Sequence, residues 1–141
     1  MANAIMLDTG PLGALAHPRA NPVITRWLIS KQNSGSEVLI PEIADYEVRR
    51  ELIRQHLTRS VQRLDELHNL LIYAPIDTSI MLRAAELWAT VRNMGRPTAD
   101  PHSLDGDVIL AAKAEHAGAV VATENVAHLG LFVEARDWRN L

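Results

Sequence analysis

The chain has 141 residues, of which 48% are hydrophobic and 22% charged, and this balance indicates one globular domain rather than a disordered chain. It contains no cysteine, which excludes disulfides, thiolate zinc sites and cysteine nucleophiles. The net charge of −3 excludes a globally basic protein, although five arginines gather in one short stretch: Arg49, Arg50, Arg54, Arg59 and Arg63.

The first half of the chain predicts strands that are each followed by helices. Its predicted strands are short apolar runs, at residues 4–7, where the run ends in Asp8, and at residues 38–40. Its predicted helices cover residues 9–17, a segment that opens at Asn21 and Pro22 and ends near residues 33–35, and a segment from Pro41 to about Leu57. We expect the second of these helices to turn Val23, Trp27 and Leu28 inward.

The second half predicts three further helices and two or three further strands. One helix carries apolar residues at helical spacing (Val61, Leu64, Leu67 and Leu71), and residues 70–73 are also compatible with a strand. The clearest helix is capped by Asp77 or Thr78 and closed by Gly95, and its expected inward residues are Ile80, Ala84, Leu87, Val91 and Met94. Residues 96–106 predict an irregular loop, residues 107–117 a helix with Ile109 and Ala112 inward, and residues 119–122 and 132–133 two short strands.

Short apolar strands that alternate with helices are typical of an α/β domain with a mainly parallel sheet. In such sheets, functional sites form at the carboxyl ends of the strands. Asp8 ends the first strand, Glu47 lies in the helix after the second, and Asn125 follows the fourth. These residues are therefore expected to lie near one another.

The start of the chain does not have the pattern of a secretion signal. No positive charge precedes its apolar run, and Asp8 interrupts that run. No apolar run approaches the roughly 20 residues that a membrane-spanning helix needs. We expect a cytoplasmic protein without membrane contact, in agreement with the lack of cysteine.

Asp8 is the first candidate for a functional carboxylate. Burying an unpaired charge is costly, so a carboxylate at the end of an apolar strand should point out at the edge of the sheet. The alternative is structural, because Asp8 can also cap the following helix by accepting backbone N–H groups. Both roles are compatible with each other.

Glu47 is the second candidate, and spacing alone favours a structural role for it. It can pair with Arg50 along the helix, as Glu51 can with Arg54. Other carboxylates compete with it in the same stretch, namely Glu42, Asp45 and Glu51.

Asp107 is the third candidate, with Asp105 close by. An acidic residue in the first turn of a helix is favoured by the helix dipole, so either Asp can simply be a cap. One of them can cap the helix while the other binds a metal.

Three or four carboxylates in a chain without cysteine favour hard cations, Mg²⁺ or Mn²⁺, over zinc. A cation would relieve the mutual repulsion of these groups, and the chemistry that such clusters support is phosphodiester hydrolysis. The six histidines are scattered. His128 lies closest to the expected site, but a lone histidine is more often structural or exposed.

Four segments, in order, resemble the PIN-domain family and, within it, the stand-alone VapC-like toxins. They are Leu7-Asp8-Thr9 at the end of the first strand, Glu47 in the helix after the second strand, Asp107 before Val108-Ile109-Leu110-Ala111-Ala112, and Thr123-Glu124-Asn125. The similarity lies in the order and spacing of these segments and extends over nearly the whole chain.

The resemblance implies a PIN-like three-layer α/β/α fold with a short, mainly parallel sheet, in a single domain over residues 1–141. It also implies a metal-dependent endoribonuclease with Mg²⁺ or Mn²⁺ as cofactor. Its metal ligands would be Asp8, Glu47 and Asp107, with Asp105 in reserve, and Asn125 would complete the catalytic set. Its substrate-binding residues would be Thr9, Arg49, Arg50 and Arg54.

Asn125 departs from the commonest family pattern, in which an Asp stands at this place. An amide offers a carbonyl oxygen without charge, which weakens the case for a second metal ion. The alternative function is therefore a catalytically weak or inactive PIN-like module that binds RNA or protein. A phosphatase or phosphotransfer domain is disfavoured, because Gly10 stands where a second Asp would be needed.

Partners also follow from the resemblance, which implies an RNA substrate, a homodimer and, for a toxin, a cognate antitoxin. Trp27, Leu28 and Trp88 are candidates for an apolar dimer contact. Equally, the tryptophans can fill a core that has few other aromatic residues. An antitoxin would be expected to place a basic side chain among the carboxylates and an acidic stretch against the arginines of residues 49–63.

Overall fold

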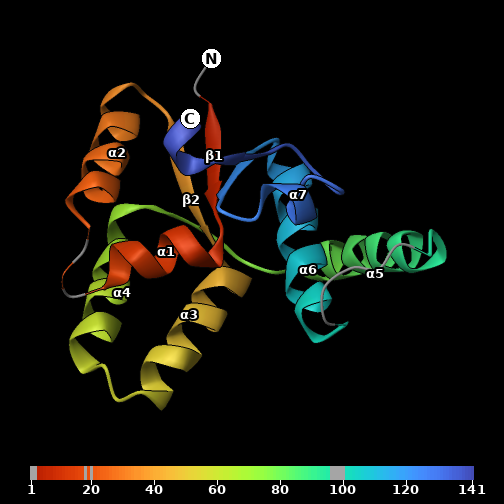
Figure 1. Ribbon diagram of the computed structural model, residues 1–141, viewed down its shortest axis with the longest axis horizontal. Coiled ribbons are helices and arrows are strands. Elements are labelled where there is room, and N and C mark those ends of the chain that lie inside the picture. Colours follow the sequence, from red (N-terminus) through yellow and green to blue (C-terminus); the bar gives the residue numbers. More distant parts are fainter. Residues whose placement is uncertain (1–2, 18, 20, 96–100) are drawn as a thin grey trace.

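Five parallel strands form the single sheet of the computed structural model, which describes residues 3–17, 19, 21–95 and 101–141. The strand order is β3-β2-β1-β4-β5, so the first strand of the chain lies in the centre (Figure 1). The bounds are β1 Ala4–Leu7, β2 Glu37–Pro41, β3 Ile72–Ala74, β4 Val120–Thr123 and β5 Ala135–Asp137. Each of the four strand pairings is parallel, which confirms the predicted sheet type.

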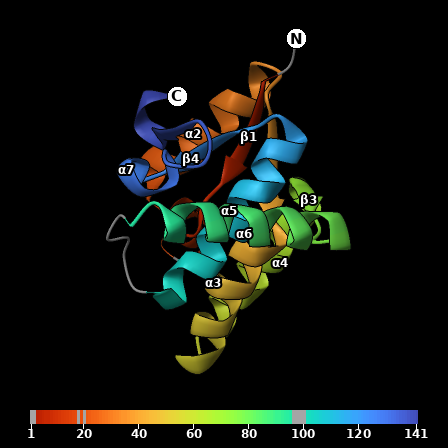
Figure 2. The ribbon, with the colours of Figure 1, turned by 90° about the vertical axis from the view of Figure 1, so that its right-hand side faces the viewer.

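Helices cover both faces of this sheet and complete a three-layer α/β/α arrangement. Figures 1 and 2 show α1 to α4 gathered on one side and α5 and α6 on the other. The helices are α1 Thr9–Ala16, α2 Pro22–Asn33, α3 Glu42–Arg54, α4 Thr58–Leu70, α5 Thr78–Asn93, α6 Pro101–Ala117 and α7 Val126–Leu129, and a 3-10 turn follows at Trp138–Asn140. Among the described residues, none of the helices combines the length and the apolar character needed to cross a membrane.

Local signals in the sequence set several helix ends, as predicted. The side chain of Asn21 accepts a hydrogen bond from Val23 N at 2.9 Å and starts α2, and Asp77 does the same for Ile80 N at 2.9 Å and starts α5. Gly95 and Gly118 follow α5 and α6 with φ of +65° and +62°. This left-handed conformation, which glycine adopts without strain, turns the chain out of each helix.

Three predicted element boundaries are wrong. The helix expected from Pro41 to about Leu57 is α3, which ends at Arg54. The helix expected from residue 107 starts at Pro101, because proline is well suited to a first turn and the fully buried Leu104 extends the apolar face toward the amino end. The remainder of the predicted loop, residues 96–100, lies outside the described residues. The strand expected at residues 132–133 is a turn, since Phe132 N and Val133 N both donate to Leu129 O, and the strand β5 begins at Ala135.

Two predicted core residues are exposed instead. Val23 is 51% exposed, because Ile24 and Leu28 take the inward positions of α2. Met94 is 53% exposed, since α5 ends one residue before it. Trp27 is partly buried and packs edge-to-face on Trp138, with ring centres 5.8 Å apart. It therefore contributes to the core, which is the second of the two roles predicted for the tryptophans.

The core has two parts. The larger surrounds the sheet and includes the fully buried Met6, Leu7 and Ile40. The smaller lies between α5 and α6, and it is formed by Ile80, Ala84, Leu87, Leu104, Val108, Ala111 and Ala112. This second cluster fixes α6 on its α5 side, which leaves the opposite side of α6 facing α3 and the ends of the strands.

Candidate active site

The site is built at the carboxyl ends of the two central strands. Asp8 directly follows β1, and its backbone N–H donates to Ala122 O of β4 at 3.0 Å. Thr123 ends β4 next to it, and Asn125 comes two residues later. The parallel pairing of β1 with β4 therefore brings together residues that are 115 positions apart in the chain.

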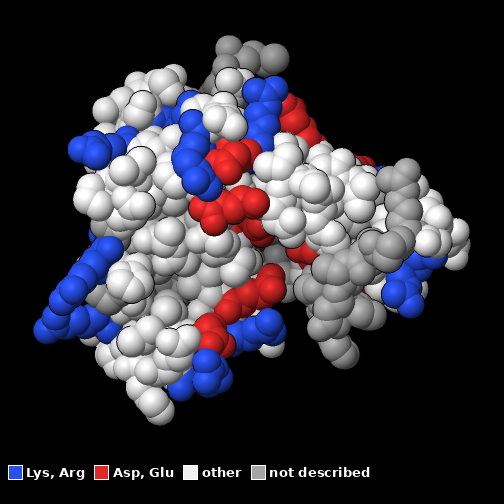
Figure 3. Space-filling view, viewed as in Figure 1, with Lys and Arg blue, Asp and Glu red and all other residues white. Residues whose placement is uncertain are grey.

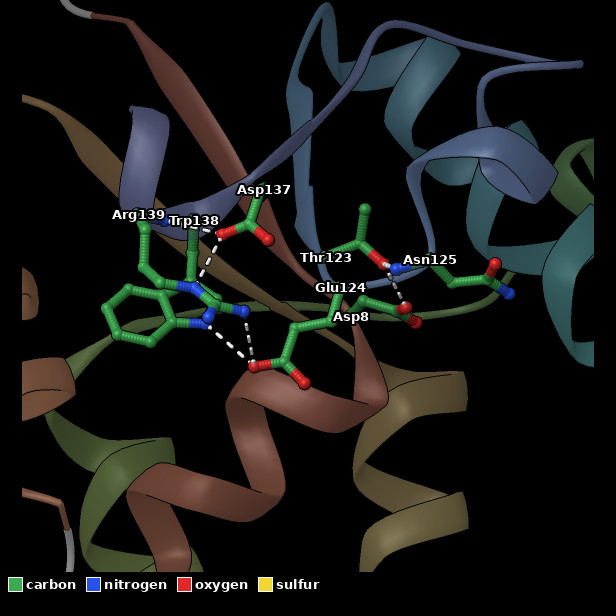
Figure 4. Close-up of polar contacts among 7 residues, drawn as sticks. All are labelled: Asp8, Thr123, Glu124, Asn125, Asp137, Trp138 and Arg139. Carbon is green, nitrogen blue, oxygen red and sulfur yellow. Dashed lines mark hydrogen bonds and ion pairs between the residues drawn. The ribbon is translucent and has the colours of Figure 1, made fainter.

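Asp8 is held by hydrogen bonds to both of its carboxylate oxygens, of which Figure 4 shows the one from Thr123. Its Oδ1 accepts from Thr9 N at 2.8 Å, which caps α1, and its Oδ2 accepts from the Thr123 hydroxyl at 2.8 Å. The Thr123 hydroxyl in turn accepts from Asn125 N at 2.8 Å, and Thr123 is fully buried. Asp8 is thus a helix cap and a fixed carboxylate at the same time.

Glu47 reaches the same place from α3. Its side chain is 27% exposed, with Oε1 3.5 Å from the Thr9 hydroxyl and Oε2 3.9 Å from Arg50 Nη2. The helix α6 passes close by at Gly106, where a Cβ atom would lie only 2.9 Å from Glu47 Oε1. Because glycine has no Cβ, Gly106 leaves space for the Glu47 carboxylate.

Asp107 comes from the side of α6 that faces the strand ends. Its Oδ2 lies 2.7 Å from Nε2 of His128, a residue of α7. The two atoms are within ion-pair distance, but Nε2 makes no hydrogen bond of acceptable geometry within the described part of the chain. Asp107 lies in the second turn of α6, so the capping role considered for it does not apply.

The three carboxylates influence one another. Burial raises the pKa of Glu47, Arg50 opposes this rise, and the charges of Asp107 and Asp8 add to it. Burial likewise raises the pKa of Asp107, His128 opposes the rise, and Asp8 adds to it. The site therefore concentrates negative charge that its cationic neighbours only partly balance.

This arrangement fits a hard divalent cation in its chemistry. The donors are carboxylate oxygens, and their mutual repulsion is what a bound cation would relieve. Among the described residues, no three acidic or histidine side chains lie close enough together to hold a metal ion as they stand. Repulsion keeps like charges apart in the absence of a cation, so an open cluster agrees with this electrostatic picture.

Asp105 lies elsewhere. It is exposed and faces α5, where it lines an apolar groove of about 380 Å³ together with Met81, Trp88 and Val108. This position does not support the role of reserve ligand that the sequence suggested. The side chain of Asn125 is exposed, and in Figure 4 it points away from Asp8.

The arginines expected to bind substrate differ in their surroundings. Arg49 bridges Asp45 and Asp65, at 2.9 Å and 2.8 Å, and so ties α3 to α4. Arg54 pairs with Glu51 on the same helix. Arg50 alone of the three lies beside a carboxylate of the site, and its side chain is 61% exposed.

A second basic residue, Arg139, lies near the strand ends. Arg139 Nη2 is 3.2 Å from Glu124 Oε1, which also accepts from the Trp138 indole N–H at 3.2 Å (Figure 4). Figure 3 shows the acidic side chains of this face along a hollow between the two halves of the molecule, with basic side chains on its borders.

Sequence reasoning did not assign two residues of this site. Thr123 belongs to the Thr-Glu-Asn segment noted at the end of the fourth strand, and its position there was the signal for a role beside Asp8. His128 is the histidine expected closest to the site, but a lone histidine is more often structural or exposed, and nothing in the local pattern indicates which carboxylate it meets.

Comparisons with known proteins concern the family and the fold of the chain. The family model described as PIN domain matches residues 5–128. No curated protein is significantly similar to the chain in sequence. Solved structures with the same fold include VapBC2 from Rickettsia felis bound to a DNA fragment from their promoter, with a TM-score of 0.79, 14% identity, and coverage of 96% of this chain and 98% of that chain.

Two further structures are similar over nearly their whole length. VapBC-1 from nontypeable Haemophilus influenzae has a TM-score of 0.69 and 22% identity, covering 96% of this chain and 98% of that chain. VapC20 from Mycobacterium tuberculosis, a toxin that cleaves the sarcin-ricin loop, has a TM-score of 0.68 and 19% identity, covering 94% of this chain and 98% of that chain. At these identities the likeness concerns the fold.

Proposed function

Because the chain belongs to the PIN-domain family, we propose that it is a divalent-metal-dependent endoribonuclease and the toxin of a toxin–antitoxin pair. The observation that carries this proposal is the meeting of three carboxylates from separate segments, Asp8, Glu47 and Asp107, at the ends of the central strands.

Asp8, Glu47 and Asp107 would hold Mg²⁺ or Mn²⁺. When bound, such an ion lowers the pKa of a coordinated water and stabilises charge on a phosphate. The chain itself keeps Asp8 in place through Thr123 and Thr9, so that this carboxylate needs little reorganisation. The hydroxyl of Thr9, 3.5 Å from Glu47, is positioned to orient a carboxylate or a phosphate oxygen.

Arg50 is the best placed of the predicted substrate-binding arginines. It is largely exposed and lies beside Glu47, so its guanidinium can contact a phosphate of an RNA strand that enters the site. Arg49 and Arg54 are engaged with carboxylates of α3 and α4, and their contribution would be to the positive potential near the site.

Partners of the structural relatives support the antitoxin part of the proposal. The relatives from Rickettsia felis and Haemophilus influenzae are VapBC proteins, and a further structure of the same fold is FitAB bound to a DNA fragment. We expect an antitoxin to place a basic side chain among the three carboxylates, where a charge-assisted hydrogen bond would exclude the metal and the RNA. A homodimer belongs to the same proposal, with the 39% exposed Trp88 as its candidate contact because Leu28 is buried.

The decisive test is RNA cleavage with matched carboxylate variants. Asp8→Asn and Asp107→Asn should abolish Mn²⁺-dependent cleavage in the folded protein, whereas the neighbouring Asp105→Asn should retain it. Loss of activity in Asp105→Asn with full activity in Asp107→Asn would overturn the assignment. For the toxin, expression of the chain alone should arrest growth, and Asp8→Asn should relieve the arrest.

A binding module without strong metal affinity is the second candidate. Two observations favour it: the uncharged Asn125 points away from Asp8, and the described carboxylates are not closed around one point. Calorimetry distinguishes the two functions, because no heat of binding for Mg²⁺ or Mn²⁺ at millimolar concentration would favour the module.

A further inference from the structure

His128 is the one histidine that meets the carboxylate cluster within the described residues. It lies on α7, the short helix that follows the β4 end, and its side chain is only 11% exposed. Its Nε2 atom is 2.7 Å from Asp107 Oδ2. The imidazole is therefore part of the wall of the site and not a surface group.

The contact with Asp107 is an ion pair that does not meet the geometric criteria for a hydrogen bond. Nε2 is buried and has no hydrogen-bond partner of acceptable geometry in the described part of the chain, despite the short distance to the carboxylate. A buried polar atom left without a partner costs free energy, and such atoms in folded proteins usually have a ligand, ion or water to satisfy them.

The separation of the two atoms suits a shared cation. Two neighbouring ligands of an octahedral ion, each with a bond of about 2.1 Å, lie about 3 Å apart. Nε2 and Oδ2 are at 2.7 Å, so small side-chain shifts bring both into contact with one ion. Neutral imidazole nitrogen is also the commonest protein ligand for transition metals.

We propose that His128 is a direct ligand of the metal held by Asp107, which gives the site one nitrogen donor and a preference for Mn²⁺ over Mg²⁺. This inference rests on the proposed metal-dependent function. A softer nitrogen donor favours a first-row transition ion over Mg²⁺, which binds carboxylates, phosphates and water.

Pulsed electron paramagnetic resonance of the Mn²⁺-loaded protein tests the inference directly. Electron spin echo modulation from a coordinated ¹⁴N nucleus should be present in the unmodified protein and absent in His128→Gln. His116→Gln is the matched control, because His116 is exposed in the last turn of α6 and should leave the modulation unchanged.

Calorimetry with Mn²⁺ and Mg²⁺ supplies the second measurement. His128→Gln should weaken Mn²⁺ binding about tenfold or more and change Mg²⁺ binding by much less. Mn²⁺ bound without ¹⁴N modulation, or modulation that persists in His128→Gln, would overturn the inference while the proposed function stands. Absence of Mn²⁺ binding in the unmodified protein would overturn both.

Discussion

Replacing Thr123 by valine removes one hydroxyl that joins two segments of the site. The hydroxyl donates to Asp8 Oδ2 and accepts from Asn125 N, both at 2.8 Å, in a side chain with no exposed surface. Valine has nearly the same shape, so the substitution leaves packing intact and deletes the two hydrogen bonds.

The expected loss of stability follows from those two bonds. A hydrogen bond to a carboxylate contributes about 1.5–3 kcal/mol and a neutral one about 0.5–1.5 kcal/mol. Asp8 is partly exposed, so water can replace part of its lost bond, and the lower half of the summed range is expected, about 2–3 kcal/mol. With a urea slope of about 2 kcal/mol per molar, the unfolding midpoint should fall by about 1 M.

Thr123→Ser is the matched control, since serine keeps the hydroxyl and loses one methyl group. Its expected cost is about 1 kcal/mol, the usual result of removing a buried methyl. Urea unfolding of the metal-free proteins should therefore rank them as wild type, serine, then valine. A valine variant as stable as the serine variant would refute the view that the hydroxyl holds Asp8. Mn²⁺ affinity provides a second readout, because an unsupported Asp8 should bind about tenfold more weakly.

Four further substitutions test other features of the site. Gly106→Ala should stabilise α6 by about 1 kcal/mol, because alanine favours a helix more than glycine does. The same substitution should weaken Mn²⁺ binding, because the new Cβ would lie 2.9 Å from Glu47 Oε1. Calorimetry measures this effect, and an unchanged Mn²⁺ affinity would contradict it. Burial raises the pKa of Glu47 above 4.5, so the metal-free protein should lose stability as pH rises from that value through the folded pKa, and Glu47→Gln should remove this loss. Thermal unfolding of both proteins between pH 4 and neutrality checks this prediction. A stability difference between Glu47→Gln and the unmodified protein that does not increase with pH would contradict it. Arg49→Ala should lower the free energy of unfolding, measured in urea, by about 1–3 kcal/mol, because it leaves the buried Asp45 without its partner. Arg50→Ala should instead weaken RNA binding and leave the stability unchanged.

Features that depend on neighbouring residues were predictable from the sequence. Asn21 and Asp77 cap their helices with side chains two or three residues from the groups that they bind, and the capping pattern is visible in the sequence. Asp8 also belongs here, because an apolar strand that ends in a carboxylate forces that group to the sheet edge. The order of strands and helices was sufficient to place the site at the carboxyl ends of the sheet.

Features that depend on packing between distant segments were not predictable. Asp105 and Asp107 are two residues apart, and only the contact of α6 with α5 decides that the first faces an apolar groove and the second the carboxylates. The sequence predicts that Arg49 binds substrate, whereas in the structure Arg49 pairs with Asp65 of α4. The turn at Phe132 forms because Phe132 N and Val133 N donate to Leu129 O at the end of α7. No periodicity in the sequence indicates these hydrogen bonds.

The central position of β1 has a consequence for how the protein is made. Its neighbour β4 is synthesised more than a hundred residues later, so one edge of β1 stays unpaired until β4 has left the ribosome. Contacts of such long sequence separation form slowly, because loop closure must precede them. Asp8 meets Thr123 only after that pairing. A nascent chain therefore cannot bring Asp8 to Thr123, and so cannot complete the candidate site, before β4 has been synthesised.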